Sequence, residues 1–156
     1  MKFHVTEDVS APIEAAWTGF TDFAALEAQL AEKGAQLHRL GGWREAHPGA
    51  GWHGTVHVRG TSYPVEAHVA RIAPREACAI ESRIGGMECS YLSTFRALSP
   101  EDTRVDITLD VRARTLSARL ILQSLKFART QALHRIEGFV VRRGKAVERG
   151  WRRARA

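Results

Sequence analysis

The stretch CAIESRIGGMECSYLS, residues 78–93, decides the fold of this chain. Gly85 and Gly86 stand at its centre, and a Gly-Gly pair between two alternating runs is a strong signal for a two-residue β-hairpin turn. The partners that this turn sets on one face are Ile84–Met87, Ser82–Cys89, Ile80–Tyr91 and Cys78–Ser93. On the other face it sets Arg83 opposite Glu88, an attractive cross-strand pair. The stretch therefore predicts an antiparallel hairpin.

A second hairpin is predicted upstream, where apolar and polar residues alternate on both sides of Gly60 and Thr61. With those two residues as the turn, the predicted partners are Val58–Tyr63, Val56–Val65, Gly54–Ala67 and Trp52–Val69 on one face, and His53–His68 and Thr55–Glu66 on the other. The first face is apolar, and a slip of one residue would mix the two faces. The register is therefore expected to be well specified.

Two further turns extend these hairpins into a sheet. Residues 73–76 join the two hairpins, and residues 99–102 lead into a last strand. The apolar residues that alternate with polar ones in this strand are Val105, Ile107, Leu109 and Val111. Hairpin-connected strands with one apolar face form an antiparallel sheet, and that face needs a cover.

Residues 115–147 are predicted to form one long helix that covers this face. Its stripe at 3.6-residue spacing consists of Leu122, Leu125, Ala132, Ile136, Phe139 and Val140. At 1.5 Å per residue the helix would be ~50 Å long, enough to cross the whole sheet. Gly138 and Gly144 are the positions where it is expected to bend or stop. Residues 150–156 are expected to fray.

The first fifty residues predict a strand that ends near Ser10 and then two short helices. Pro12 suits the first turn of one helix, and Asp22 is placed to cap the next, which Gly34 ends. A short strand over residues 35–40 and a glycine-rich loop over residues 41–51 follow. This order of elements predicts an α+β protein.

Composition and charge limit the classes of protein to which the chain can belong. The chain has 156 residues, of which 44% are hydrophobic and 26% charged, as in a soluble single domain. No apolar run approaches the ~20 residues of a membrane span, and residues 1–8 are too charged for a secretion signal. We therefore expect a cytoplasmic protein in which Cys78 and Cys89 are buried thiols.

The basic residues gather at the end of the chain. Residues 1–113 hold 11 Lys and Arg against 15 Asp and Glu, a net charge of −4, whereas residues 114–156 hold 12 against 2, a net charge of +10. Such a basic helix is either a solvated face or a surface for an anionic partner.

The order of elements, together with VSAPIEAAW (residues 9–17) and Thr103-Arg104-Val105 after an acidic turn, resembles the START-like superfamily, also called SRPBCC. The group includes polyketide cyclase/dehydrase-like and lipid-transfer proteins. The resemblance covers residues 1–148, with 149–156 as a basic tail. It implies a helix-grip fold, in which a curved antiparallel sheet of about six or seven strands wraps a long C-terminal helix around a cavity. Many members carry a Trp- or Pro-rich segment near the cavity mouth, whereas residues 24–30 here are typical of a helix.

Catalytic and metal-binding patterns are weak. A cross-strand His53–His68 pair with Glu66 could bind zinc, but a solvated polar face explains these residues better, and we predict no metal site. There is no Gly-x-Ser-x-Gly elbow, no pair of acids on the apolar face and no phosphate-binding loop. We therefore predict neither catalytic residues nor a cofactor.

The apolar face is the candidate binding site. It either packs as a dry core against the helix or lines a pocket for an apolar ligand, and the resemblance favours the pocket. Tyr91, Ser93 and Arg129 are candidate polar contacts. The full set of predicted ligand-binding residues is Trp52, Val56, Tyr63, Val65, Ile80, Tyr91, Ser93, Phe95, Leu109, Leu122, Leu125 and Arg129.

Three functions remain open from the sequence. The first is a noncatalytic carrier of a hydrophobic small molecule or lipid, and the second is an enzyme of the polyketide cyclase/dehydrase type. The third is contact of the basic C-terminal helix with an anionic membrane or RNA. Nucleic acid is the less favoured partner, because only Trp151 among the basic residues could stack on bases. The ligand and the oligomeric state are not predicted.

Overall fold

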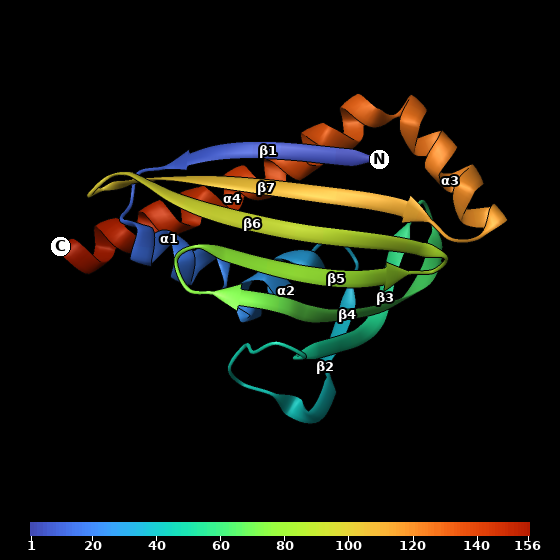
Figure 1. Ribbon diagram of the computed structural model, residues 1–156, viewed down its shortest axis with the longest axis horizontal. Helices are drawn as coiled ribbons and strands as arrows, with labels where there is room; N and C mark the ends of the chain where they lie inside the picture. The colour runs from blue at the N-terminus through green and yellow to red at the C-terminus, as the bar shows by residue number, and fades with distance from the viewer.

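The computed structural model describes residues 1–156 as a seven-stranded antiparallel sheet with four α-helices (Figure 1). The strands are β1 (Lys2–Val9), β2 (Gln36–Arg39), β3 (Gly51–Val58), β4 (Thr61–Ala73), β5 (Ala77–Ile84), β6 (Met87–Ser99) and β7 (Asp102–Ala113). The helices are α1 (Ile13–Phe20), α2 (Phe23–Ala31), α3 (Leu116–Phe127) and α4 (Arg129–Arg155), with a short 3-10 helix at Leu40–Gly42. The strand order is β1-β7-β6-β5-β4-β3-β2, which places β1 and β2 at the edges. The predicted α+β architecture is confirmed.

The β5–β6 hairpin has the predicted register. Ile84 lies opposite Met87 and Cys78 opposite Ser93. Arg83 lies opposite Glu88, and their side chains are 3.8 Å apart. Because every partner follows from the two-residue turn, local sequence was enough to set this pairing.

The predicted register of the β3–β4 hairpin was wrong by two residues. Val58 pairs with Thr61, so the turn residues are Arg59 and Gly60. Both have positive φ, 50° and 80°, as a type I′ turn requires. The predicted turn would have required a positive φ at Thr61, which a β-branched residue rarely adopts. Since the shift is even, each residue keeps its predicted face.

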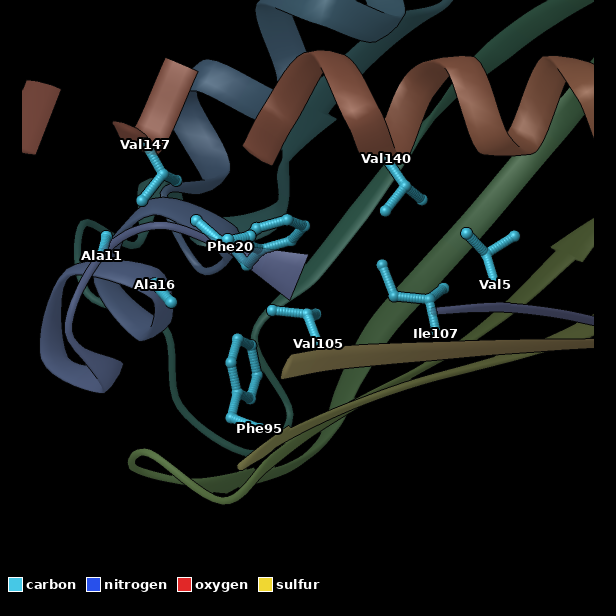
Figure 2. Close-up of a cluster of buried hydrophobic side chains, with 10 residues drawn as sticks. Val5, Ala11, Ala16, Phe20, Phe95, Val105, Ile107, Val140 and Val147 are labelled. Carbon is cyan, nitrogen blue, oxygen red and sulfur yellow. The ribbon is translucent and has the colours of Figure 1, made fainter. Parts of the chain in front are cut away.

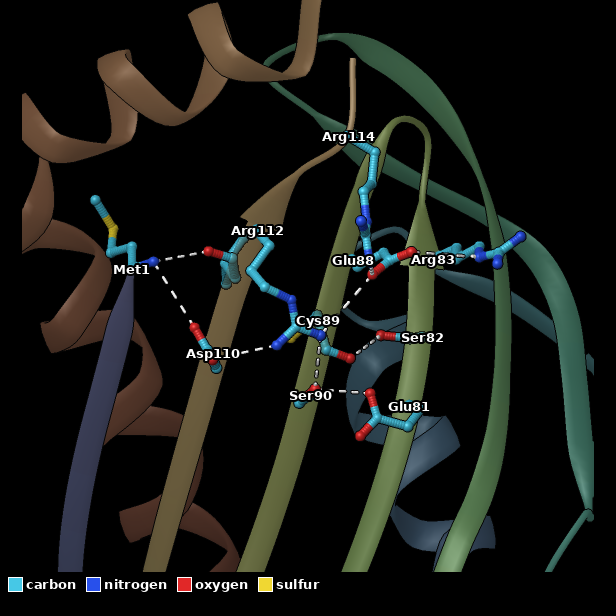
Figure 3. A network of polar contacts seen from close by, with 11 residues as sticks. Met1, Glu81, Ser82, Arg83, Glu88, Cys89, Ser90, Asp110, Arg112 and Arg114 are labelled. Carbon is cyan, nitrogen blue, oxygen red and sulfur yellow. Dashed lines mark hydrogen bonds and ion pairs between the residues drawn. The ribbon is translucent and has the colours of Figure 1, made fainter.

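The outer face of the sheet is polar, as the alternation predicted. Figure 3 shows its network around Glu88, whose carboxylate lies 2.8 Å from the Arg114 guanidinium. Arg112 donates to Asp110 at 3.3 Å and to the Ser90 hydroxyl at 3.2 Å. The contacts to Glu88 and Ser90 join β6 to β7 and the residue that follows it, whereas Arg112 and Asp110 belong to the same strand. All lie on the solvent side, so the opposite face is left for the helices.

Helix α2 begins at its predicted cap, whereas Pro12, expected in the first turn of the preceding helix, is the N-cap residue of α1. The Asp22 carboxylate accepts a hydrogen bond from the backbone N–H of Ala25 at 3.1 Å and so caps α2. Gly34 follows this helix with a φ of 94°, which glycine adopts without strain. The two helices lie under one end of the sheet (Figure 1).

The predicted single helix over residues 115–147 was wrong, because the helix breaks at Ala128, whose φ and ψ are −101° and 22°. Neither Gly138 nor Gly144 interrupts α4. The break has a tertiary cause. Thr115, at the start of α3, lies against Gly86 in the β5–β6 turn, while Arg129, at the start of α4, donates to the Lys2 carbonyl at 2.6 Å. The two helices are thus anchored to different parts of the sheet, α3 at the β5–β6 turn and α4 at β1.

The last residues are helical as far as Arg155, so the expected fraying of residues 150–156 was wrong. Helix α4 runs to Arg155, and Trp151 packs against the hydrophobic core. The buried Glu148 carboxylate accepts a hydrogen bond from the backbone N–H of Ser10 at 2.9 Å. None of the helices is both long and apolar enough to cross a membrane.

The hydrophobic core has two clusters. The first joins β1, α1, β6, β7 and α4 (Figure 2), and its members are Val5, Val9, Ala11, Ala16, Phe20, Phe95, Val105, Ile107, Val140 and Val147. The second joins α2 to β3, β4 and β5, and its members are Phe23, Ala50, Trp52, Val69 and Cys78. Trp17 packs against both clusters. The dry core therefore occupies the half of the sheet beside α1 and α2.

Candidate binding site on the inner face of the sheet

The other half of the inner face is less completely buried, although Tyr91 and Ile80 still pack against the first and second cluster. Its residues share the face of the two clusters, because strand side chains alternate, yet they are only half-buried. We call them the inner band: Val56, Tyr63, Ile80, Ser82, Ile84, Met87, Cys89, Tyr91, Leu109 and Val111. They lie toward the β3–β4 and β5–β6 turns. Their side chains point inward and still keep accessible apolar surface.

The placement of the helices explains this exposure. Helix α4 lies along β1 and α1, and α3 meets the sheet at β7 (Figure 1). Helix α4 therefore covers the β1 side of the sheet, while α3 leads away from the end of β7. Leu122 and Leu125 of α3 are also half-buried. Together with the inner band, these two leucines form the candidate site.

The structure brings seven of the twelve predicted binding residues to this site as half-buried side chains. They are Val56, Tyr63, Ile80, Tyr91, Leu109, Leu122 and Leu125. Strand alternation places the five strand residues on one face of the sheet. Helical periodicity places Leu122 and Leu125 on one face of α3.

Three other predicted residues belong to packed regions. The indole N–H of Trp52 donates to the Glu27 carboxylate at 2.6 Å within the second cluster. The Phe95 ring lies edge-on to Trp17, with ring centroids 5.2 Å apart. Val65 is buried with 6% exposure. Their side chains are occupied by the protein itself.

Two predicted polar contacts already have protein partners. Ser93 is fully buried, and its hydroxyl donates to the Cys78 carbonyl at 3.4 Å. Arg129 donates to the Lys2 carbonyl and stacks on the ring of Phe3 at 4.8 Å, which places it at the β1 edge. Tyr91 is thus the predicted polar group that remains in the inner band.

The site is neutral. Burial raises the pKa of Tyr91 to about 12, although the nearby Ser93 hydroxyl acts in the opposite direction. Burial also raises the pKa of Cys89 above its ordinary value, and raises the pKa of Cys78 to about 11. All three groups are protonated at neutral pH, so the site offers hydroxyl and thiol dipoles but no activated nucleophile.

The sequence-based set of binding residues missed five members of the inner band. They are Ser82, Ile84, Met87, Cys89 and Val111. The signal was present, because the correctly predicted β5–β6 register places four of them on the apolar face. Selecting the largest apolar residues favoured the positions that are packed.

The histidines are arranged differently from the prediction. His53 lies opposite Glu66 on β4 and opposite His38 on β2, so the predicted His53–His68 pair does not form. The His38 and His53 rings have centroids 5.5 Å apart. No group of three or more His, Cys, Asp or Glu side chains is arranged to hold a metal ion.

A hollow of about 560 Å³ lies at the junction of α3 and α4. Its lining consists of Arg59 from the β3–β4 turn and Ser124, Phe127, Ala128, Thr130 and Gln131 from the two helices. The turn and the helix junction therefore approach each other at the open end of the sheet without closing on each other.

Comparison with known proteins bears on the fold. No protein-family model matches the chain, and no curated protein matches its sequence. Among solved structures, a conserved protein from Geobacillus kaustophilus superposes with a TM-score of 0.70 and 13% identity, over 96% of each chain. The Zhui aromatase/cyclase from Streptomyces sp. R1128 has a TM-score of 0.65 and 17% identity, over 92% of this chain and 94% of its own.

A START superfamily protein from Mycobacterium smegmatis has a TM-score of 0.58 and 17% identity, over 88% of this chain and 97% of its own. These likenesses extend over nearly the whole length of each chain, and they include the sheet and its long C-terminal helix. The chain therefore has the START-like, helix-grip fold.

Proposed function

We propose that this protein binds a hydrophobic small molecule or lipid between the inner band and α3. The observation that carries the proposal is the half-buried state of ten inward-pointing residues beside a fully packed half-core. A protein interior normally packs to the density of organic crystals, so an unpacked apolar half is unusual. The START-like resemblance, which implies a ligand cavity, supports the same interpretation.

The chemistry of the inner band indicates the class of ligand. None of its ten residues carries a formal charge, and its hydroxyl and thiol groups are those of Tyr63, Ser82, Cys89 and Tyr91. Such a surface favours a largely apolar molecule with a few neutral oxygens. We place this ligand in the domain formed by residues 1–148 and the protein in the cytoplasm.

Mass spectrometry of the natively purified protein tests the proposal, with a discrete apolar compound as the expected result. A matched pair of variants locates the site. Ser82→Trp places an indole in the inner band, whereas Leu92→Trp places one on the outer face of the adjacent strand. We expect Ser82→Trp alone to lose the compound and to weaken binding of an apolar fluorescent probe at least about tenfold. Equal binding by both variants, both folded, would contradict this site.

A second candidate function is catalysis of the polyketide cyclase/dehydrase type. The observation that favours it is the neutral Tyr91 phenol in the inner band, because a protonated hydroxyl can orient a substrate carbonyl or donate to it. Tyr91→Phe should then retain binding of the apolar probe but lose turnover of a polyketide substrate. Unchanged turnover in this variant would exclude Tyr91 from catalysis.

A further inference from the structure

Helix α3 is apolar on two faces. Its inner face carries Ala118, Ile121, Leu122 and Leu125, all buried or half-buried. Its outer face exposes three large apolar side chains: Leu116 by 77%, Leu120 by 66% and Phe127 by 95%. At 100° per residue these three positions fall within about 40° of one another around the helix. We call Leu116, Leu120 and Phe127 the outer stripe.

The outer stripe lies in a strongly cationic part of the chain. Residues 111–136 contain no Asp or Glu, and their Lys and Arg residues are Arg112, Arg114, Arg119, Lys126, Arg129 and Arg135. Arg112 and Arg114 form ion pairs with acids on the outer face of the sheet. Arg119 and Lys126, which adjoin the outer stripe on α3, form no ion pair.

The surroundings of the outer stripe leave room for a partner. Phe127 also lines the hollow at the α3–α4 junction, where Arg59 supplies a further cation that forms no ion pair. The opposite side of the same helix carries Leu122 and Leu125, which belong to the candidate site. A partner on the outer stripe would therefore sit one helix away from the proposed ligand.

We propose that α3 docks on an anionic lipid bilayer, with the outer stripe inserted among the headgroups and Arg119 and Lys126 against lipid phosphates or carboxylates. An exposed apolar stripe beside unpaired cations is the pattern of helices that lie in a membrane interface. A second copy of the chain is a poorer partner, because a two-fold interface would bring the cations of both copies together.

If the proposed ligand function holds, the bilayer would be the source or destination of the ligand. The docking itself does not depend on the proposed ligand site. It also differs from docking through the exposed cations of α4. The outer stripe supplies apolar area, which the cluster of Arg149, Arg152 and Arg153 near the chain end lacks.

Co-sedimentation with vesicles tests the proposal, using phosphatidylcholine with about 30% phosphatidylserine against phosphatidylcholine alone. We expect binding to the anionic vesicles, weakened by salt because the Debye length shrinks. The triple variant Leu116→Gln, Leu120→Gln, Phe127→Gln should bind at least about tenfold more weakly, since it removes three apolar contacts. The control is Leu92→Gln with Leu98→Gln, which changes exposed leucines on β6 and should bind as the parent does.

Two further variants test the cations of α3 and those of α4 separately. Arg119→Gln with Lys126→Gln should weaken binding by about fivefold per charge. Arg149→Gln, Arg152→Gln, Arg153→Gln should have a smaller effect than the triple variant of the outer stripe. The proposal is overturned if the α4 variant abolishes binding while the outer-stripe variant retains it. It is also overturned if vesicles do not bind and ultracentrifugation shows a dimer that the outer-stripe variant dissociates.

Failure of docking can be told apart from failure of the cavity. The apolar probe should bind the outer-stripe variant as tightly as the parent, since none of the three residues belongs to the inner band. Probe binding without vesicle binding would refute docking alone. Vesicle binding without probe binding would support docking and refute the ligand site.

Discussion

The two cysteines point inward from neighbouring strands and nevertheless occupy different surroundings. Cys78 is 1% exposed and packs in the cluster of Trp52 and Val69. Cys89 is half-buried in the inner band, opposite Ser82 and Val111. The boundary between the packed and unpacked halves of the inner face therefore runs between these two thiols.

N-ethylmaleimide should report this boundary. We expect it to modify Cys89 and to leave Cys78 untouched in the folded protein, with modification traced by peptide mass spectrometry. Because burial raises the pKa of Cys89, the thiolate fraction and hence the rate should still be rising at pH 9. An apolar ligand in the site should slow the reaction. Equal modification of both thiols, or no protection by ligand, would argue against the inner band as a ligand site.

A glycine marks the closest approach of two strands. An ideal Cβ at Gly54 would overlap the carbonyl oxygen of Gln36 on β2, so the backbone of β2 would have to move. Gly54→Ala should lower the free energy of unfolding by about 2–3 kcal/mol, as measured by urea denaturation. Gly138→Ala is the control, since nothing lies within 4 Å of its Cβ position in α4. It should instead stabilise the protein by about 0.5–1 kcal/mol.

At the scale of elements, α4 is held at both ends by side-chain contacts to the backbone of other elements. Arg129 ties its first turn to β1, and Glu148 ties its sixth turn to the segment between β1 and α1. Val140 and Val147 fill the core between these ties (Figure 2). The helix is therefore positioned along its whole length, while α3 is left free to differ in direction.

Replacing Glu148 tests one of these ties. Glu148→Ala leaves the Ser10 N–H without its acceptor and should cost about 1–3 kcal/mol of unfolding free energy. Glu148→Gln keeps an acceptor oxygen and should cost less than half as much. The measurement is chemical denaturation at neutral pH. Equal losses in the two variants would show that the charge of Glu148, and not its hydrogen bond, positions α4.

At the scale of the whole molecule, two packed clusters lie beside the inner band, whose side chains are only half-buried. The two clusters, joined by Trp17, supply the stability of the free protein, and the inner band has apolar surface that remains to be buried. Ligand binding to the folded state alone stabilises it by mass action.

A saturating apolar ligand should therefore raise the melting temperature. At a concentration 100 times the Kd the gain is about 2.7 kcal/mol, which corresponds to roughly 5–10 °C for a chain of this size. Differential scanning calorimetry of the delipidated protein with and without ligand measures this shift. Ser82→Trp should abolish the shift while Leu92→Trp retains it. A shift of equal size in both variants would place the ligand outside the inner band.

The sequence alone determined most features that depend on neighbouring residues. The Gly85-Gly86 turn set the β5–β6 register, the Asp22 cap started α2, and period-two alternation separated the inner face from the outer. The β3–β4 turn was misplaced by one residue, and the register by two, because the choice between Arg59-Gly60 and Gly60-Thr61 depends on which residues accept positive φ.

Only the tertiary structure decided which inner residues are dry, where the C-terminal helix breaks and which face of α3 is exposed. These features depend on contacts between residues far apart in the chain, such as Thr115 with Gly86, Arg129 with Lys2 and Glu148 with Ser10. Hydrophobic periodicity predicts that a face is buried, but it does not identify the element that buries it. Leu116, Leu120 and Phe127 were overlooked for this reason: an apolar stripe turned outward has the same spacing as one turned inward.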